Sequence, residues 1–181
     1  LPIPYFHVTF TTDHGLNKLF GYNRRVLYDA LFWSVKVTLQ EMARECLGGQ
    51  LGITGALHTW GQKLDAHVHI HCIVTGGALS KDGKRWVRSS RRFLFDVKEL
   101  SRRYRNRLCR KVKRLWKAGE LQGCEDVDVE GLLAEIRGKK WEVYAKPFAD
   151  PENVIEYLSR YVHATAISNY RILKIAKGTV L

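Results

Sequence analysis

The sequence of 181 residues predicts an α+β fold, with helices on one face of a mainly antiparallel sheet. Two observations predict it. Short segments of alternating, β-branched and aromatic residues recur along the chain, and longer segments between them repeat apolar residues every three or four positions. Their order is strand, helix, strand, strand, a mixed helical region, strand, helix and strand, which is typical of helices packed over one face of a sheet.

The expected elements have clear boundaries. A helix at 24–46 ends before Gly48, and Asp150-Pro151 has the N-cap and first-turn residues of another helix. Strands are expected at 5–12, 51–60, 67–75, 141–146 and 166–175, a hairpin through 81–87, and helices at 24–46, 96–117 and 150–163.

Three histidines alternate in one expected strand, as His67, His69 and His71. Alternate side chains of a strand point to one face, so the imidazoles form a row while Val68 and Ile70 face the core. Neutral imidazoles are good metal ligands, and this strict spacing favours a metal site over a row of surface histidines. The ligand type favours zinc or manganese over magnesium, and a structural zinc is the competing interpretation.

Two tyrosines, Tyr157 and Tyr161, stand four residues apart in the last expected helix. This spacing places them one turn apart, at the edge of the apolar face of the helix. Tyrosines spaced in this way most often pack in a core. Beside a metal and a basic surface they acquire a second interpretation, because a phenolate is a competent nucleophile for phosphoryl transfer.

Several stretches resemble the HUH endonuclease superfamily, which is named for a His-hydrophobic-His strand that His69-Ile70-His71 fits. Within it the chain resembles the two-tyrosine rolling-circle transposases of bacterial insertion sequences. The stretches are PYFHVTFT, LHTWGQ, HVHIHCIVTGGAL and YLSRYVHATAISNYRI. They occur in the family's order and cover most of the chain outside residues 81–140.

The resemblance implies one HUH nuclease domain over residues 1–181, with a ferredoxin- or RRM-like sheet and a basic helical insertion at about 89–140. It implies metal-dependent nicking and strand transfer of single-stranded DNA at a transposon end, either linear or hairpin. Histidines would hold Mg²⁺ or Mn²⁺, and Tyr157 and Tyr161 would attack, leaving a 5′-phosphotyrosine and a free 3′-OH. The implied location is the bacterial cytoplasm, at the nucleoid.

The third metal ligand stays open at this point. His67 lies on the right face of its strand, whereas His58 and Gln62 of LHTWGQ are rivals that could instead contact DNA or orient a ligand. A tight bend at Gly61 would bring Gln62 beside the histidine row.

The positive charge of the chain, +12 in total, lies in one segment, because residues 81–117 contain 16 Lys or Arg and only three Asp or Glu. Clustered cations predict contact with nucleic acid. The candidates for gripping phosphates are Arg102, Arg103, Lys111, Lys113, Arg160 and Arg171. Surface ion pairs are the alternative for the last two.

Aromatic residues of the basic segment could stack on unpaired bases, and Trp86, Trp116 and Tyr104 are the candidates. Core packing is the stronger interpretation for Tyr104, because it lies on the apolar stripe of its helix.

Other features exclude some classes of protein. No apolar run approaches the roughly 20 residues that span a bilayer, so no membrane partner is expected. The first residues, LPIPYFHVTF, lack the basic start of a signal peptide. The four cysteines lack CxxC spacing and are expected to be reduced thiols of a cytosolic protein. The oligomeric state is not predicted.

Three alternatives share part of these features. A replication initiator or relaxase of the same superfamily would share the chemistry. A non-enzymatic nucleic-acid-binding module with a structural metal would explain the charge and the histidines. A hydrolytic nuclease using metal-activated water would tolerate the loss of both tyrosines.

Overall fold

A four-stranded antiparallel sheet is the centre of the fold, seen in a computed structural model that describes residues 3–61, 65–92, 94–148, 154, 175–176 and 179–180. The strand order is β3-β4-β1-β7, and each neighbouring pair is antiparallel. The bounds are Tyr5–Thr11 for β1, Ile53–Trp60 for β3, Ala66–Thr75 for β4 and Val143–Pro147 for β7.

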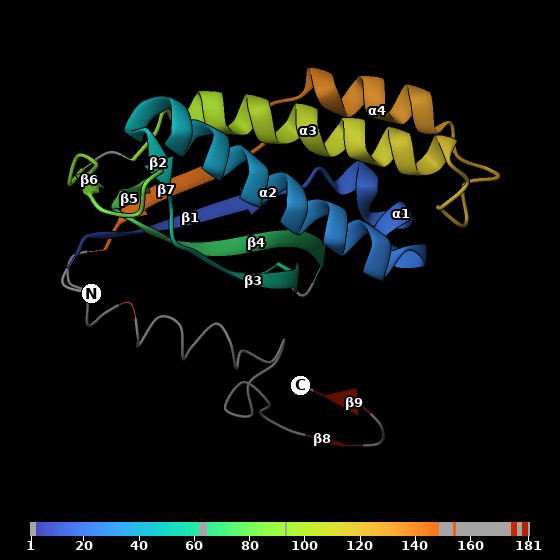
Figure 1. The fold of residues 1–181 in the computed structure, drawn as a ribbon. Helices are drawn as coiled ribbons and strands as arrows, with labels where there is room; N and C mark the ends of the chain where they lie inside the picture. Colours follow the sequence, from blue (N-terminus) through green and yellow to red (C-terminus); the bar gives the residue numbers. More distant parts are fainter. Residues whose placement is uncertain are drawn as a thin grey trace.

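Helices cover one face of this sheet (Figure 1). The two long helices, α2 (Arg24–Leu47) and α3 (Val97–Lys117), lie side by side across it. Two shorter helices complete the layer, α1 (Asn17–Tyr22) after a 3₁₀ turn at His14–Leu16, and α4 (Val129–Gly138). The α+β fold predicted from the sequence is confirmed.

Local signals set the ends of both long helices. Gly48, with φ of 67°, caps the end of α2 in the left-handed conformation that glycine adopts without strain. The Asp96 side chain accepts a hydrogen bond from the backbone N–H of Glu99 at the start of α3. The predicted helices at 24–46 and 96–117 are therefore confirmed within one residue at each end.

Two small sheets accompany the central one. Strands β2 (Gly49–Gln50), β5 (Gly77–Ser80) and β6 (Trp86–Arg88) form a three-stranded sheet in the order β2-β5-β6, which includes the predicted hairpin. Strand β8 (Ile175–Ala176) pairs with β9 (Thr179–Val180).

One hydrophobic core lies between the sheet and the helices. Tyr104 of α3 is completely buried in it, with its ring edge-on to Phe10 of β1 at 5.0 Å and to Trp141 at 5.5 Å between centroids. The predicted core position of Tyr104 is thus confirmed. The core includes Phe6, Val8, Phe10, Leu31, Leu39, Ile70, Leu100, Leu108 and Leu133. Helices from the predicted insertion at 89–140 therefore share the main core, and the boundary of that insertion stays a prediction.

The remaining predictions concern the cysteines, membrane-spanning helices and the elements expected near the end of the sequence. All four cysteines are free thiols, as predicted. No helix among the described residues is both long and apolar enough to cross a bilayer. The predicted helix at 150–163 lies outside the described residues except for Val154, which is helical and buried. The predicted strand at 166–175 also lies outside them except for Ile175 in β8.

Candidate metal centre

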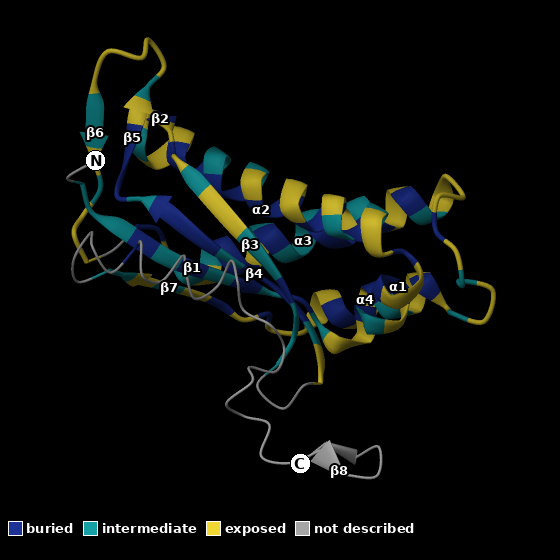
Figure 2. Cartoon of the chain, turned by 90° about the horizontal axis from the view of Figure 1, so that it is seen from below, coloured by how far each residue is buried: buried dark blue, intermediate teal, exposed yellow. Residues whose placement is uncertain are grey.

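One face of the central sheet is turned away from α2 and α3, which lie behind the sheet in Figure 2. Val68 and Ile70 are buried in the core. Because side chains alternate along a strand, His69 and His71 project from the opposite face. Partners directly opposite each other in an antiparallel pair share a face. The register therefore defines a histidine face that carries His7 and Thr9 of β1, His58 of β3, His69 and His71 of β4, and Tyr144 of β7.

Three imidazoles converge on this face. One ligand nitrogen from each of His58, His69 and His71 lies within 4.8 Å of the other two. His58 pairs directly opposite His69 in the β3–β4 register, which brings the two strands' histidines together. Two nitrogens that share an ion lie at most about 4.2 Å apart, twice the metal–nitrogen distance. Small rotations of these rings therefore suffice for one ion, and the three histidines could hold a metal.

The hydrogen bonding of His69 determines which of its nitrogens is available. Its Nδ1 lies 2.8 Å from the backbone carbonyl oxygen of His67. A carbonyl only accepts, so Nδ1 carries the proton and donates it. The lone pair of His69 is then on Nε2, in the arrangement typical of metal-bound histidines.

His71 is held by two residues of β1. Its Nδ1 lies 2.9 Å from Nε2 of His7 and 3.2 Å from the hydroxyl oxygen of Thr9. The rings of His7 and His71 are stacked, with centroids 5.1 Å apart and planes 15° apart. These contacts engage Nδ1 of His71 and fix the orientation of its ring, which leaves Nε2 as the nitrogen available to a metal.

Burial keeps these imidazoles neutral. Desolvation lowers the pKa of His71 to about 3, helped by the neighbouring histidines, and lowers the pKa of His7 to about 4. Desolvation also lowers the pKa of His69. Because a protonated imidazole has no lone pair for a metal, neutral rings at neutral pH suit ligation.

His67 lies outside this converging group. Its ring contacts that of His14, with centroids 5.0 Å apart, and that of His69 at 5.1 Å. Among the three rivals for the third ligand position, the structure therefore groups His58 with His69 and His71, leaves His67 at the edge of the group, and does not describe Gln62.

Three further residues of the histidine face were not singled out from the sequence. His7 and Thr9 alternate in YFHVTFT, and polar residues at alternate positions of a strand are the signal that could have identified them. Tyr144 lies opposite Thr9 in the β1–β7 register and is 52% exposed. Its ring is edge-on to that of His7, with centroids 6.2 Å apart. The face thus carries a phenol that sequence reasoning missed.

Several predicted site residues lie outside the described residues. They are Gln62, Tyr157, Arg160, Tyr161 and Arg171.

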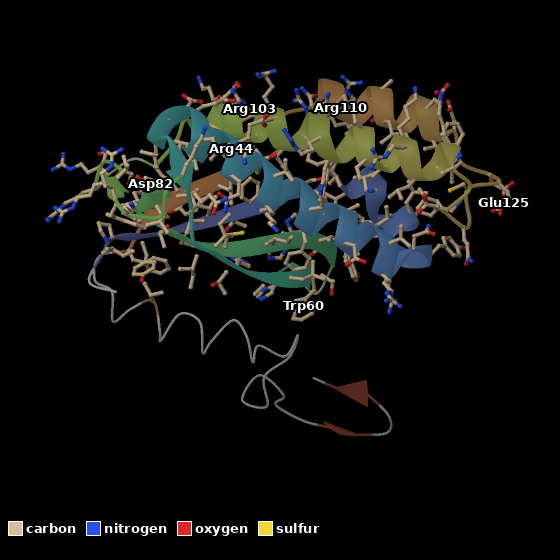
Figure 3. All side chains as sticks on the ribbon, viewed as in Figure 1. Arg44, Trp60, Asp82, Arg103, Arg110 and Glu125 are labelled. Atoms are coloured by element: carbon tan, nitrogen blue, oxygen red, sulfur yellow. The ribbon has the colours of Figure 1, made fainter. Side chains whose placement is uncertain are left out.

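The basic residues of α3 lie in the helical layer, away from the histidine face. Figure 3 shows Arg103 and Arg110 on the outer side of the helices and Trp60 on the opposite side of the molecule. Several of these cations are in ion pairs within the chain. Arg102 pairs with Glu99, Arg103 with Glu45 and Glu99, and Lys113 with Glu130. Charge clustering in the sequence therefore does not bring these cations to the histidines.

Comparisons with known proteins point to one family. A family model described as "Putative transposase" matches residues 52–181. "Putative transposase y4qJ" of Sinorhizobium fredii is 37% identical over 190 aligned positions, covering 99% of this chain and 48% of that protein. "Transposase for insertion sequence element IS801" of Pseudomonas savastanoi pv. phaseolicola is 33% identical over 186 positions, covering 98% and 43%. The chain spans about half the length of the curated relatives it matches.

Solved structures of a conjugative relaxase, TrwC in complex with oriT DNA, are partly similar in fold. A copper-bound structure covers 91% of this chain and 59% of that one, with 17% identity and a TM-score of 0.46. A metal-bound structure covers 93% and 61%, with 16% identity and a TM-score of 0.45.

Proposed function

The chain belongs to the transposase family whose model matches residues 52–181, and from this membership we propose that it nicks single-stranded DNA and transfers the cut strand in rolling-circle transposition. The substrate would be a transposon end, linear or hairpin, in the bacterial cytoplasm at the nucleoid. The observation that carries the proposal is the convergence of His58, His69 and His71 on one face of the sheet.

These three histidines would hold a divalent ion, Mg²⁺ or Mn²⁺, which polarises the scissile phosphate and stabilises its charge. All three ligands are imidazoles, and the pKa of His71 and of His69 is lowered by burial. Neutral ligands leave the double charge of an ion uncompensated, so the site attracts an anionic phosphate. His7 and Thr9 support it by fixing the ring of His71.

Tyr157 and Tyr161 are the proposed nucleophiles. The phenolic oxygen of one would attack phosphorus and the bond from phosphorus to the 3′ oxygen would break. The phenolic proton would pass to solvent, and the 3′ oxygen would take a proton from solvent and leave as a hydroxyl. The products are a 5′-phosphotyrosine and a free 3′-OH. The linkage keeps the energy of the broken bond, so rejoining needs no ATP, and a second tyrosine permits a second cleavage.

Tyr144 makes the test sharper, because it is an exposed phenol on the histidine face. We would incubate the chain with labelled single-stranded DNA and Mn²⁺ and look for a protein–DNA band that survives denaturation. The band should be absent from the double variant Tyr157→Phe, Tyr161→Phe and in EDTA, and it should persist in the matched control Tyr144→Phe. A band lost only in Tyr144→Phe would refute the assignment of the nucleophiles.

The same assay separates the alternatives. Cleavage that releases a free 5′-phosphate and survives the double tyrosine change would identify a hydrolytic nuclease. A second candidate, a nucleic-acid-binding module with a structural metal, is favoured by the all-imidazole ligand set, which suits zinc. Unfolding on chelation, with DNA binding but no cleavage, would support that module instead.

A further inference from the structure

A hollow lies beside an exposed tryptophan, between α2 and α3. Trp33 of α2 is 44% exposed and borders a hollow of about 270 Å³. The other residues that line it all come from α3 and are all cations, namely Arg107, Arg110, Lys111 and Arg114. We call these five residues the tryptophan hollow. Among the described residues, its lining contains four positive charges and no carboxylate.

Ion pairs compensate these charges unevenly. Arg107 is paired with Glu41, and its Nε is buried without an acceptor among the described residues. Arg110, Lys111 and Arg114 form no ion pair with any residue that the structure describes. Elsewhere on α3, glutamates of α2, α3 and α4 pair with Arg102, Arg103, Lys113 and Lys117, whereas Lys98 and Arg105 form no ion pair among the described residues. Three of the five α3 cations without an ion pair in the described part of the chain therefore lie around Trp33, where an anion would relieve their mutual repulsion.

The indole itself has a cation beside it. The Nζ atom of Lys111 lies 5.8 Å from the centre of the Trp33 ring, within the range of a cation–π interaction. An exposed aromatic ring among cations is the combination that proteins use for unpaired nucleotides, because a base stacks on the ring while cations hold the adjacent phosphates.

We propose that the tryptophan hollow binds a segment of single-stranded DNA, with a base stacked on Trp33 and phosphates held by Arg110, Lys111 and Arg114. Lys111 moves from the ring to a phosphate when the base arrives, because an anion attracts an ammonium more strongly than a ring does. The proposal takes its partner class, single-stranded DNA, from the proposed function.

The hollow lies in the helical layer, and Arg110 points outward from that layer, whereas the histidine face is on the other side of the sheet (Figure 3). A segment bound here is therefore not the segment that is cut. It would be a neighbouring part of the same strand, held while the scissile phosphate is at the histidines. Charge alone would also attract duplex DNA or an acidic peptide, but an accessible indole adds affinity for bases that are not already stacked in a duplex.

Binding of a fluorescent thymidine oligonucleotide of about 15 nucleotides to the whole chain tests this proposal. EDTA is present throughout, so that no metal-held phosphate contributes. We expect Trp33→Ala to weaken binding roughly 5- to 150-fold, the effect of one stacked base. Trp33→Phe keeps a ring and should retain more of the affinity. Since Trp33 is exposed, thermal denaturation should show both variants folded.

The contribution of the cations is tested with the double variant Lys111→Ala, Arg114→Ala. It should lower the slope of log affinity against log salt by about 0.7 for each phosphate that the variant no longer holds. The matched control is Lys81→Ala, Lys84→Ala, which removes two exposed cations from the β5–β6 turn. Unchanged binding in Trp33→Ala would overturn the proposal, and so would equal reductions of affinity in the two double variants.

The outcome is separable from that of the proposed function. If the wild-type chain forms the covalent band but Trp33→Ala binds DNA with unchanged affinity, the proposed DNA binding at the tryptophan hollow is refuted. The proposed nuclease activity is then still supported. DNA binding that depends on Trp33, without any covalent band, would support binding at the tryptophan hollow and refute the proposed attack by tyrosine.

Discussion

His7 Nε2 lies 2.9 Å from His71 Nδ1, and this contact ties β1 to the candidate metal centre. The hydroxyl oxygen of Thr9 lies 3.0 Å from the same atom of His7 and 3.2 Å from that of His71. One of the two nitrogens carries a proton and donates a hydrogen bond, which the other nitrogen accepts. When His71 offers Nε2 to an ion, its Nδ1 bears the proton and His7 is the acceptor, as expected for a residue that positions a metal ligand.

His7→Ala should therefore weaken the binding of Mn²⁺ about 10- to 100-fold, because the ring of His71 loses the partner that fixes its orientation and tautomer. Isothermal titration of the metal-free chain measures this. His7→Asn keeps an acceptor and should recover part of the affinity. His14→Ala is the control outside the converging group. Wild-type affinity in His7→Ala would show that the contact is structural only.

His58→Ala and His67→Ala separate the rivals for the third ligand position. His58 belongs to the converging group and His67 does not. Loss of His58 should reduce metal affinity as much as loss of His69 does, whereas loss of His67 should have a smaller effect. The same titration applies to each variant. A larger loss in His67→Ala than in His58→Ala would reverse the assignment.

The sequence could predict the histidine row but not its third partner, and strand geometry explains why. Residues four apart in a strand lie about 13 Å from each other, so His67 and His71 are poorly spaced for a common ion. A residue directly opposite on the next strand is about 5 Å away at Cβ. His58 meets His69 in this way, but only the β3–β4 register reveals the pairing.

Much of the fold was predictable for a different reason. Apolar periodicity is a local property, so α2, α3 and the strand of histidines follow from neighbouring residues. The short helix α1 was not predicted, because its six residues hold too few turns for a periodic signal. The position of the basic helix was also not predictable, because charge counts do not tell which face of the sheet a helix covers.

Acidification should destabilise the metal-free chain. Unfolded histidines take up protons near pH 6.5, whereas burial lowers the pKa of His7 to about 4 and of His71 to about 3. Between pH 6.5 and 4 the unfolded state thus holds more protons than the folded state, so the free energy of unfolding falls as pH falls. Urea denaturation in EDTA at several pH values measures it. His71→Phe should flatten the dependence, and an unchanged slope would contradict this account.

Tyr104→Phe should stabilise the chain. The Tyr104 side chain is completely buried, and its hydroxyl has no hydrogen-bond partner among the described residues. A buried hydroxyl without a partner costs about 1–3 kcal/mol, and phenylalanine removes it while keeping the ring against Phe10 and Trp141. Tyr104→Ala, in contrast, should destabilise the chain by about 3–5 kcal/mol because it leaves a cavity between the sheet and α3. Thermal and urea denaturation distinguish the two variants. A lower melting temperature in Tyr104→Phe would mean that the hydroxyl is satisfied in solution, since the ring packing is the same in both proteins.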